Sequence, residues 1–294
     1  MVTKQLQEHA NELLRHSVGA RTRDIYGKHV NTYIQFHNSL NLGTPFRLKS
    51  LRCFIAHLHK SGSRHSSVLS NMAALKYHCR LYGIANDLDS QVLKMTIRGV
   101  RNSNFPRSQP SRVITVTELG DINRMANSCF FKFEATLVRA VMTTAFFGFL
   151  RVSEYTKTCA GHSLLISGCD VSASKAVITI PSSKFGSTAV KLALPAQKNK
   201  YACPIYNLRR YLSVRPKNKN DQLFLYADGK PISDDSVRRW LRVLCMALHT
   251  DVVTPHALRI GGATWAASQG WPDSVIRSHG RWKSDAFLQY IRPC

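Results

Sequence analysis

Residues 255–294 read PHALRIGGATWAASQGWPDSVIRSHGRWKSDAFLQYIRPC, and this stretch decides how the second half of the chain is interpreted. His256 and Arg259 stand three residues apart after a Thr-Pro pair, so both share one face of a predicted helix. Gly261 and Gly262 follow at once, although a glycine inside a helix costs about 1 kcal/mol. We therefore expect another backbone or a ligand to pack closely against this helix.

Tyr290 ends the segment SDAFLQY, a short predicted helix with Ser284 as its N-cap. A tyrosine beside Phe287 and Leu288 is most often a core or interface residue. A phenol can also attack a phosphodiester without a metal, because it is displaced again easily, but it needs cationic neighbours or a base. A helix carrying His-x-x-Arg offers both proton transfer and a guanidinium for the phosphate.

Upstream, the apolar run FEATLVRAVMTTAFFGF at 133–149 predicts a helix that ends near Arg151, with Glu154 on the same face. An arginine against so apolar a helix needs an anion, either Glu154 or a bound phosphate. The segments HSLLISGCDVS, KAVITIP and AVKLALP then predict short strands. The last two flank SSKFGST and predict a hairpin with Lys184 at its tip, where a lysine is either simply solvated or able to reach a leaving oxygen.

The chain is expected to be mainly α-helical with a small antiparallel β-sheet. Residues 1–102 place apolar residues at three- and four-residue spacing and predict a helical domain. The stretch SNFPRSQPSR at 103–112 has the composition of a linker. The second domain, 113–294, combines the strands with helices, the first of which is capped by Thr117 and runs to about Cys129.

The composition is strongly basic, with 41 lysines and arginines against 17 acids and a formal net charge of +24. Both predicted domains carry the excess, which favours a clamp around a polyanion over a charge that serves only solubility. The candidate contacts with a nucleic-acid backbone are basic residues of the predicted polar faces and linker: Arg21, Arg23, Lys28, Arg64, Lys76 and Arg112.

The eight cysteines show no C-x-x-C pair, and several lie in apolar runs where buried thiols are expected. A zinc site from Cys159, His162 and Cys169 would match no familiar ligand spacing, so we expect no metal. The opening MVTKQLQEHANELL is amphipathic rather than a signal peptide, and no apolar run reaches about 18 residues. We expect an intracellular protein that does not act at a membrane.

The order of these residues resembles the catalytic domain of the tyrosine recombinase (phage integrase) family. That family's pattern is Arg-x-x-Glu, a hairpin Lys, His-x-x-Arg, a His or Trp, and a nucleophilic Tyr. The matching residues here are Arg151, Glu154, Lys184, His256, Arg259, Trp282 and Tyr290. The sequences HALRIGGAT and GRWKSDAFLQYIR are most similar to eukaryotic DIRS and Ngaro retrotransposon recombinases, and the first domain resembles the family's helical core-binding domain.

Two features depart from the family's pattern. Trp282 has a residue type that the His/Trp position normally takes, whereas the usual spacing from Tyr290 gives Arg281, and His279 is a third candidate. The sequence also stops at Cys294, where many relatives continue into a segment that packs on a neighbouring subunit. Assembly is therefore expected to use other surfaces, unless the chain is a fragment.

The resemblance implies a site-specific DNA recombinase that cuts and rejoins strands through a 3′-phosphotyrosine, without metal, cofactor or ATP. It implies that Arg151 and Arg259 hold the scissile phosphate. Lys184 would protonate the leaving 5′-hydroxyl, His256 would assist proton movement, and Trp282 would pack or donate a hydrogen bond. It further implies double-stranded DNA and a homo-oligomer (dimer or tetramer) as partners, no small-molecule substrate, and the nucleus as location. The alternatives are a type IB topoisomerase-like nicking and resealing enzyme, an inactive domesticated DNA-binding protein, and a basic RNA-binding protein.

Overall fold

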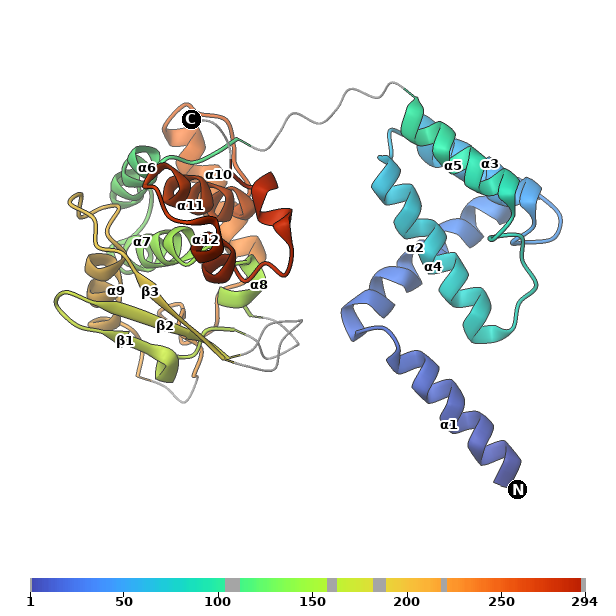
Figure 1. Ribbon diagram of the computed structural model, residues 1–294, viewed down its shortest axis with the longest axis horizontal. Coiled ribbons are helices and arrows are strands. Elements are labelled where there is room, and N and C mark those ends of the chain that lie inside the picture. The colour runs from blue at the N-terminus through green and yellow to red at the C-terminus, as the bar shows by residue number, and fades with distance from the viewer. Residues whose placement is uncertain (1, 104–111, 158–162, 182–188, 218–220, 292–294) are drawn as a thin grey trace. The chain divides into compact units, whose positions relative to one another are not determined.

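The computed structural model describes residues 2–103, 112–157, 163–181, 189–217 and 221–291. The chain divides into two units, Met1–Ser108 and Gln109–Cys294, which are described separately below (Figure 1). Helices dominate both, and unit 2 adds a small antiparallel sheet, which confirms the predicted fold class. Most of the expected linker lies outside the described residues, so its boundaries stay a prediction.

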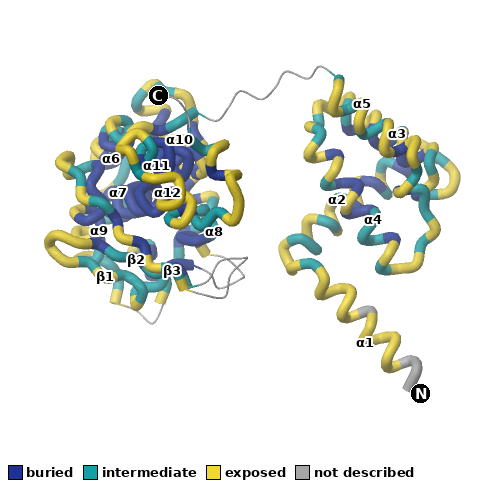
Figure 2. The backbone as a smooth tube through the Cα atoms, viewed as in Figure 1, coloured by how far each residue is buried: buried dark blue, intermediate teal, exposed yellow. Residues whose placement is uncertain are grey.

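Unit 1 is a helical bundle built at the stretches where the apolar spacing predicts helices. Its helices are α1 (Val2–His16), α2 (Ala20–Ser39), α3 (Leu48–Lys60), α4 (His65–Tyr82) and α5 (Gln91–Asn102). Helix α2 packs against α4 and α3 packs against α5, around a core that includes the fully buried Tyr33 and Phe54. The described side chains of α1 are almost all exposed, as Figure 2 shows.

Unit 2 is organised around one buried helix. Its helices are α6 (Val116–Cys129), α7 (Lys132–Phe147), α8 (Val152–Tyr155), α9 (Pro204–Leu212), α10 (Asp234–Ala247), α11 (Pro255–Ser268) and α12 (Asp273–Gly280), with 3-10 turns η1 (Ile166–Gly168) and η2 (Asp285–Gln289). Every residue of α7 from Ala135 to Phe147 is buried, as expected for a helix that is apolar on all sides. Helices α6, α9 and α11 pack around it.

The three strands form an antiparallel sheet in the order β1 (Cys169–Val171), β2 (Ala176–Ile180) and β3 (Val190–Leu194). Alternate residues of β2 are buried, so one face of the sheet covers the core. The register pairs Ile178 with Leu192 and confirms β2 and β3 as a hairpin. Lys184, expected at its tip, lies outside the described residues.

The predicted end of the apolar helix is wrong. Helix α7 ends at Phe147 rather than near Arg151, because the chain reverses at Phe149, whose φ of 44° lies in the left-handed region. The N–H of Leu150 then donates to the carbonyl of Ala145 at 2.9 Å, which closes the turn. Arg151 consequently stands at the N-cap of α8 instead of closing α7.

The predicted cap of α6 is also wrong. The helix begins after Thr115, not after Thr117. Thr115 Oγ1 accepts the N–H of Glu118 at 3.2 Å, while the Glu118 carboxylate accepts the N–H of Thr115 at 2.9 Å. This reciprocal capping box satisfies two backbone donors, which Thr117 inside the first turn could not do.

The glycine pair of α11 makes the close approach that the sequence predicts. A Cβ atom on Gly262 would lie 2.0 Å from the carbonyl oxygen of Phe146 in α7, and one on Gly261 would lie 2.3 Å from that of Ile114. Only glycine lets the backbones meet at this distance. The pair therefore fixes α11 against the end of α7, where the chain turns toward Arg151.

Candidate active site

Five of the predicted residues lie close together in unit 2, where α8, α11 and the chain after α12 meet. Arg151 precedes α8, and His256 and Arg259 lie on α11, with Pro255 at its first turn. Trp282 follows α12, and Tyr290 is the C-cap of η2. Helices α11 and α12 pack against each other, and in Figure 1 α8 lies next to α12. Lys184 lies outside the described residues and cannot be placed with them.

Arg259 is the buried centre of the site, only 1% exposed. Its guanidinium donates to the carbonyl of Phe149 and, at 2.7 Å, to that of Gly280. It also lies 4.3 Å from the ring centroid of Trp282, a cation–π contact. Burial, together with the nearby Arg151 and Arg281 guanidiniums, lowers the pKa of Arg259. The residue is therefore a rigidly held cation with an incomplete set of counter-charges.

Glu154 connects the cations around it. Its Oε1 lies 3.0 Å from Arg151 Nη1, and its Oε2 accepts the backbone N–H of Arg151 at 2.7 Å. Arg281 Nη2 donates to the same Oε2 at 2.6 Å. Burial alone would raise the pKa of Glu154, but Arg281, Arg151 and Arg259 outweigh it and lower the pKa below its ordinary value. Two guanidiniums thus pair with one carboxylate while Arg259 adds a third positive charge nearby, and the excess positive charge suits a phosphate.

Tyr290 is half-buried against α11. Its carbonyl accepts a hydrogen bond from Thr264 Oγ1 at 3.0 Å, which attaches the backbone after η2 to the helix. Its ring centroid lies 5.2 Å from that of His256 and 5.0 Å from that of Trp282. The Arg259 guanidinium lies 5.7 Å from the same ring. The phenol therefore has a cation, an imidazole and an indole as neighbours.

His256 keeps access to solvent while its ring packs edge-to-face on Tyr290, at an interplanar angle of 69°. Desolvation by the surrounding atoms, together with the positive charges of Arg259 and Arg151, lowers the pKa of His256. The imidazole is consequently neutral near pH 7 and able to accept a proton.

The three candidates for the His/Trp position face different neighbours. His279 approaches the carbonyl of Phe147 at 2.8 Å through Nε2, and Arg281, in the left-handed region at φ 58°, turns toward Glu154. Trp282 alone of the three has ring contacts with Arg259 and Tyr290. A Cβ on Gly280 would lie 1.6 Å from the Trp282 indole, so that glycine is needed for the ring to lie where it does.

Arg281 has a role that the sequence reasoning missed. Besides pairing with Glu154, it donates to the carbonyls of His279 at 2.7 Å, Gly148 at 3.2 Å and Phe149 at 3.2 Å. It therefore ties the turn after α7 to the end of α12. The available signal was the spacing from Tyr290, which pointed to position 281, although no spacing shows which way a side chain turns.

The candidate DNA contacts divide into two groups. Lys76 is paired with Asp89, and Arg112 with Glu118. Arg23 donates to two backbone carbonyls, one at the end of α1 and one just after it. The remaining candidates are exposed: Arg21, Lys28 and Arg64. The second group is free of the internal ion pairs that occupy Lys76 and Arg112 among the described residues.

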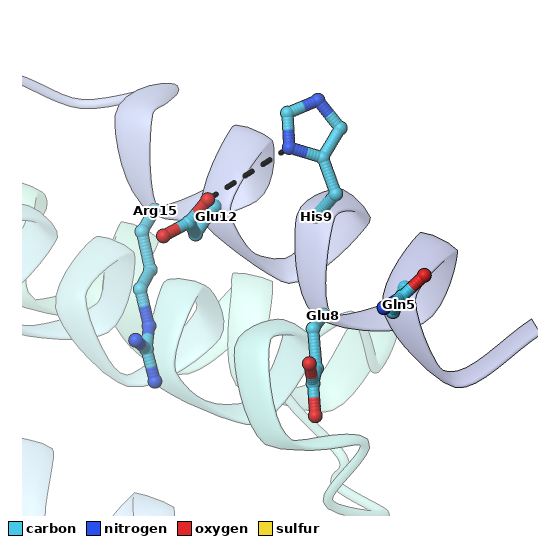
Figure 3. A pocket seen from close by; sticks show the side chains of 5 residues that line it. All are labelled: Gln5, Glu8, His9, Glu12 and Arg15. Atoms are coloured by element: carbon cyan, nitrogen blue, oxygen red, sulfur yellow. Dashed lines mark ion pairs between the residues drawn. The ribbon is translucent and has the colours of Figure 1, made fainter. Parts of the chain in front are cut away.

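Other candidate sites in the described residues are weaker. A shallow depression along α1 is lined by Gln5, Glu8, His9, Glu12 and Arg15 (Figure 3). Its ion pair, His9 Nδ1 to Glu12 Oε2 at 3.8 Å, is two-thirds exposed and contributes little. In the described ranges no group of His, Cys, Asp or Glu is suited to a metal, and Cys159 and His162 of the considered zinc site fall outside them. Nor does any helix of those ranges have the length and apolar character for crossing a bilayer.

Residues 112–291 match the Phage integrase family. No curated protein sequence matches the chain. The fold is similar to that of the Tn1549 transposon integrase in complex with circular intermediate DNA, at 15% identity, TM-score 0.65, and coverage of 96% of this chain and 94% of that one.

Two further solved structures share the fold. The XerA recombinase has 18% identity and a TM-score of 0.51, over 100% of this chain and 95% of that one. A lambda integrase dimer bound to a COC′ core site has 16% identity and a TM-score of 0.58, over 97% of this chain and 75% of that one. At such identities the likeness concerns the fold of both units.

Proposed function

Since the chain belongs to the phage integrase family, we propose that it is a tyrosine-type DNA strand transferase, the site-specific recombinase or integrase of a mobile element. The observation that supports this most is the packing of His256, Arg259 and Tyr290 against one another beside Arg151. These are the residue types that a metal-free attack on a phosphodiester needs, drawn from separate segments of the chain.

In the proposed reaction, Arg151 and Arg259 hold the non-bridging oxygens of the scissile phosphate and stabilise the charge that grows on them. The phenol oxygen of Tyr290 forms a bond to phosphorus while the bond to the 5′ oxygen breaks, leaving a 3′-phosphotyrosine and a 5′-hydroxyl. His256, neutral because its pKa is lowered, accepts the phenol proton. Lys184 supplies the proton to the 5′ oxygen, a role that rests on the family resemblance alone.

Attack by a 5′-hydroxyl of a partner strand reverses these steps and completes strand transfer. No net hydrolysis occurs, so neither ATP nor another energy source is needed. Trp282 is proposed for the His/Trp position because its indole contacts both Arg259 and Tyr290. Arg281 and Glu154 act as positioning residues that orient Arg151 from behind.

We further propose residues 1–102 as a core-binding domain that closes on duplex DNA, joined by the linker 103–112 to the catalytic domain 113–294. The exposed Arg21, Lys28 and Arg64 would contact phosphates, with salt-dependent affinity. The two similar integrases, one in a DNA complex and one a dimer on its core site, support a duplex substrate and a homo-oligomer.

The finer assignment to eukaryotic DIRS or Ngaro-type retrotransposons, and with it a nuclear location, rests on the sequences HALRIGGAT and GRWKSDAFLQYIR. Its test is the DNA that flanks the coding sequence. A reverse transcriptase reading frame and element termini beside it would support this origin, whereas a bacterial or phage context would exclude it.

The test of the chemistry is covalent trapping on a nicked suicide duplex that carries the element's terminal sequence. Wild-type protein is expected to form an adduct that survives denaturation, and Tyr290→Phe is expected to form none. Tyr82→Phe, at an exposed tyrosine of unit 1, is the matched control and should retain the adduct. An adduct that persists in Tyr290→Phe would contradict the assignment. Relaxation of supercoiled plasmid without joined products would favour the topoisomerase alternative instead.

A further inference from the structure

Arg139 is a buried cation in the middle of α7 that the proposed reaction does not use. It is 9% exposed, and its partners are the neutral oxygens of Asn127, at 2.5 Å, and Thr136, at 3.3 Å. Its Nε is buried and has no acceptor, and no carboxylate pairs with it among the described residues. A buried guanidinium without a counter-charge is unfavourable unless an anion compensates it.

The charge around Arg139 increases this imbalance. Burial lowers the pKa of Arg139, and the nearby positive charge of Arg210 lowers it further. Only the phenols of Tyr201 and Tyr206 act in the opposite direction. Arg210 thus adds positive charge near Arg139, and no carboxylate pairs with Arg139 among the described residues. A bound anion would supply the missing counter-charge.

Further exposed cations lie beside the two tyrosines that neighbour Arg139. Arg124 of α6 and Lys200 stand 5.6 and 5.3 Å from the ring centroid of Tyr201. Arg210 of α9 stands 5.9 Å from that of Tyr206. We call these residues the Arg139 patch: Arg124, Arg139, Lys200, Tyr201, Tyr206 and Arg210. Within the described ranges its one ion pair with an acid joins Arg124 to Asp121 at 3.1 Å, so the patch is positive in sum.

The Arg139 patch is separate from the candidate active site. Arg139 precedes Phe147 by eight residues, about 12 Å along the axis of α7, and Phe147 adjoins the active-site turn. The patch is built on α6, α7 and α9, which pack together, whereas the active site uses α8, α11 and α12. In Figure 1, α9 lies on the opposite side of unit 2 from α8.

We propose that the Arg139 patch binds the phosphodiester backbone of duplex DNA outside the active site. Guanidiniums and an ammonium match phosphate oxygens, and phenol hydroxyls donate to them as well. Cations held over tyrosine rings are kept at fixed positions on the surface, which suits a repeating row of phosphates. The proposal goes beyond strand transfer, and its test uses DNA that cannot be cleaved.

The first experiment measures the salt dependence of binding between the full chain and an unrelated fluorescent duplex. Lys200→Gln/Arg210→Gln removes two expected phosphate contacts, so the slope of log K against log [salt] should become shallower by about 1.8. Lys175→Gln, an exposed lysine between β1 and β2, is the control and should keep the wild-type slope. A double variant with the wild-type slope would overturn the proposal.

Arg139→Met tests whether the buried cation is there for the ligand or for the fold. We expect a shallower slope, by at most about 0.9 because Arg139 is largely buried, and a thermal midpoint that does not fall, because the variant removes an uncompensated buried charge. A lower midpoint with an unchanged slope would make Arg139 a structural residue and refute the site. A last outcome would refute DNA as the ligand and identify another anion. In it, inorganic phosphate or polyglutamate raises the thermal midpoint of wild type but not that of the double variant, while the salt slopes for DNA are the same in both.

Discussion

Replacing Arg281 by methionine tests the buried bridge behind the active site. Arg281 Nη2 lies 2.6 Å from Glu154 Oε2, and the two side chains are 5% and 6% exposed. Arg277, four residues earlier, supplies a matched control, because it too pairs with one carboxylate, that of Asp285 at 3.3 Å. That pair is 48% and 76% exposed. The two substitutions remove the same group, but the Arg281 pair is buried and Arg281 also donates to three backbone carbonyls.

The expected magnitudes follow from that difference. Removing one partner of a buried pair leaves the other charge without compensation and costs about 3–5 kcal/mol. Glu154 keeps Arg151 as a partner, but Arg151 is 39% exposed and compensates only partly. Arg281→Met also leaves the carbonyls of Gly148 and Phe149 with one donor fewer each. Arg277→Met should cost less than about 1 kcal/mol, the usual value for an exposed pair.

Urea unfolding followed by tryptophan fluorescence measures this cost in unit 2. All four tryptophans lie there: Trp240, Trp265, Trp271 and Trp282. With a denaturant slope of about 2 kcal/mol per M, Arg281→Met should lower the midpoint by about 1.5–2.5 M and Arg277→Met by less than about 0.5 M. Equal midpoints for the two variants would refute the bridge.

Acid supplies a second check on the same pair. The pKa of Glu154 is lowered in the folded protein, so its pairing stabilises the fold above the ordinary carboxyl pKa of about 4.3 and is lost as pH falls through the lowered value. The difference in unfolding free energy between wild type and Arg281→Met should therefore narrow below about pH 4. A difference that stays constant to pH 3 would mean that the carbonyl contacts, and not Glu154, account for the effect.

Three further outcomes are expected. Gly262→Ala should lower the unfolding free energy of unit 2 by more than about 3 kcal/mol in urea, because its Cβ would lie 2.0 Å from a carbonyl oxygen. Gly99→Ala in α5 is the control: its Cβ would meet open space, so stability should stay the same or rise by up to about 1 kcal/mol. The rate of adduct formation should stay constant from pH 8 to below pH 6.5, because the pKa of His256 is lowered and its imidazole stays neutral. A rate that already falls near pH 7 would exclude His256 as the base. Trp282→Leu should slow single-turnover adduct formation by about 2- to 30-fold through loss of the 4.3 Å contact with Arg259, and an unchanged rate would open the His/Trp position again.

The parts of the fold that depend on local pattern could be predicted from the sequence. Apolar spacing gives the helices of both units, and Ser284 caps its element as predicted. The Gly261–Gly262 pair predicts that another backbone packs closely on α11, because glycine in a helix carries a local cost that only a tertiary contact offsets. In each case the information lies within a few residues of the feature.

The parts that depend on distant contacts could not be predicted. Nothing in FFGFLR marks Phe149 as left-handed, since glycine is the usual residue there and Gly148 stands one position too early. The turn is held from outside, by Arg259 and Arg281, which both donate to the Phe149 carbonyl. Such strain persists only where the surrounding structure determines it, and its position at the meeting point of three cations agrees with a functional role.

The charge balance of the site relates that strain to the proposed chemistry. Arg151 and Arg281 pair with Glu154, and Arg259 lies near them without a carboxylate partner among the described residues. Folding therefore brings guanidiniums together at a cost that burial increases. A scissile phosphate bound as proposed would offset that cost, because a ligand that binds only the folded state stabilises it. A site that serves only the fold would have been more stable with apolar residues in these positions. The excess of cations is therefore better explained by a reversibly bound anion than by a contribution to the stability of the fold.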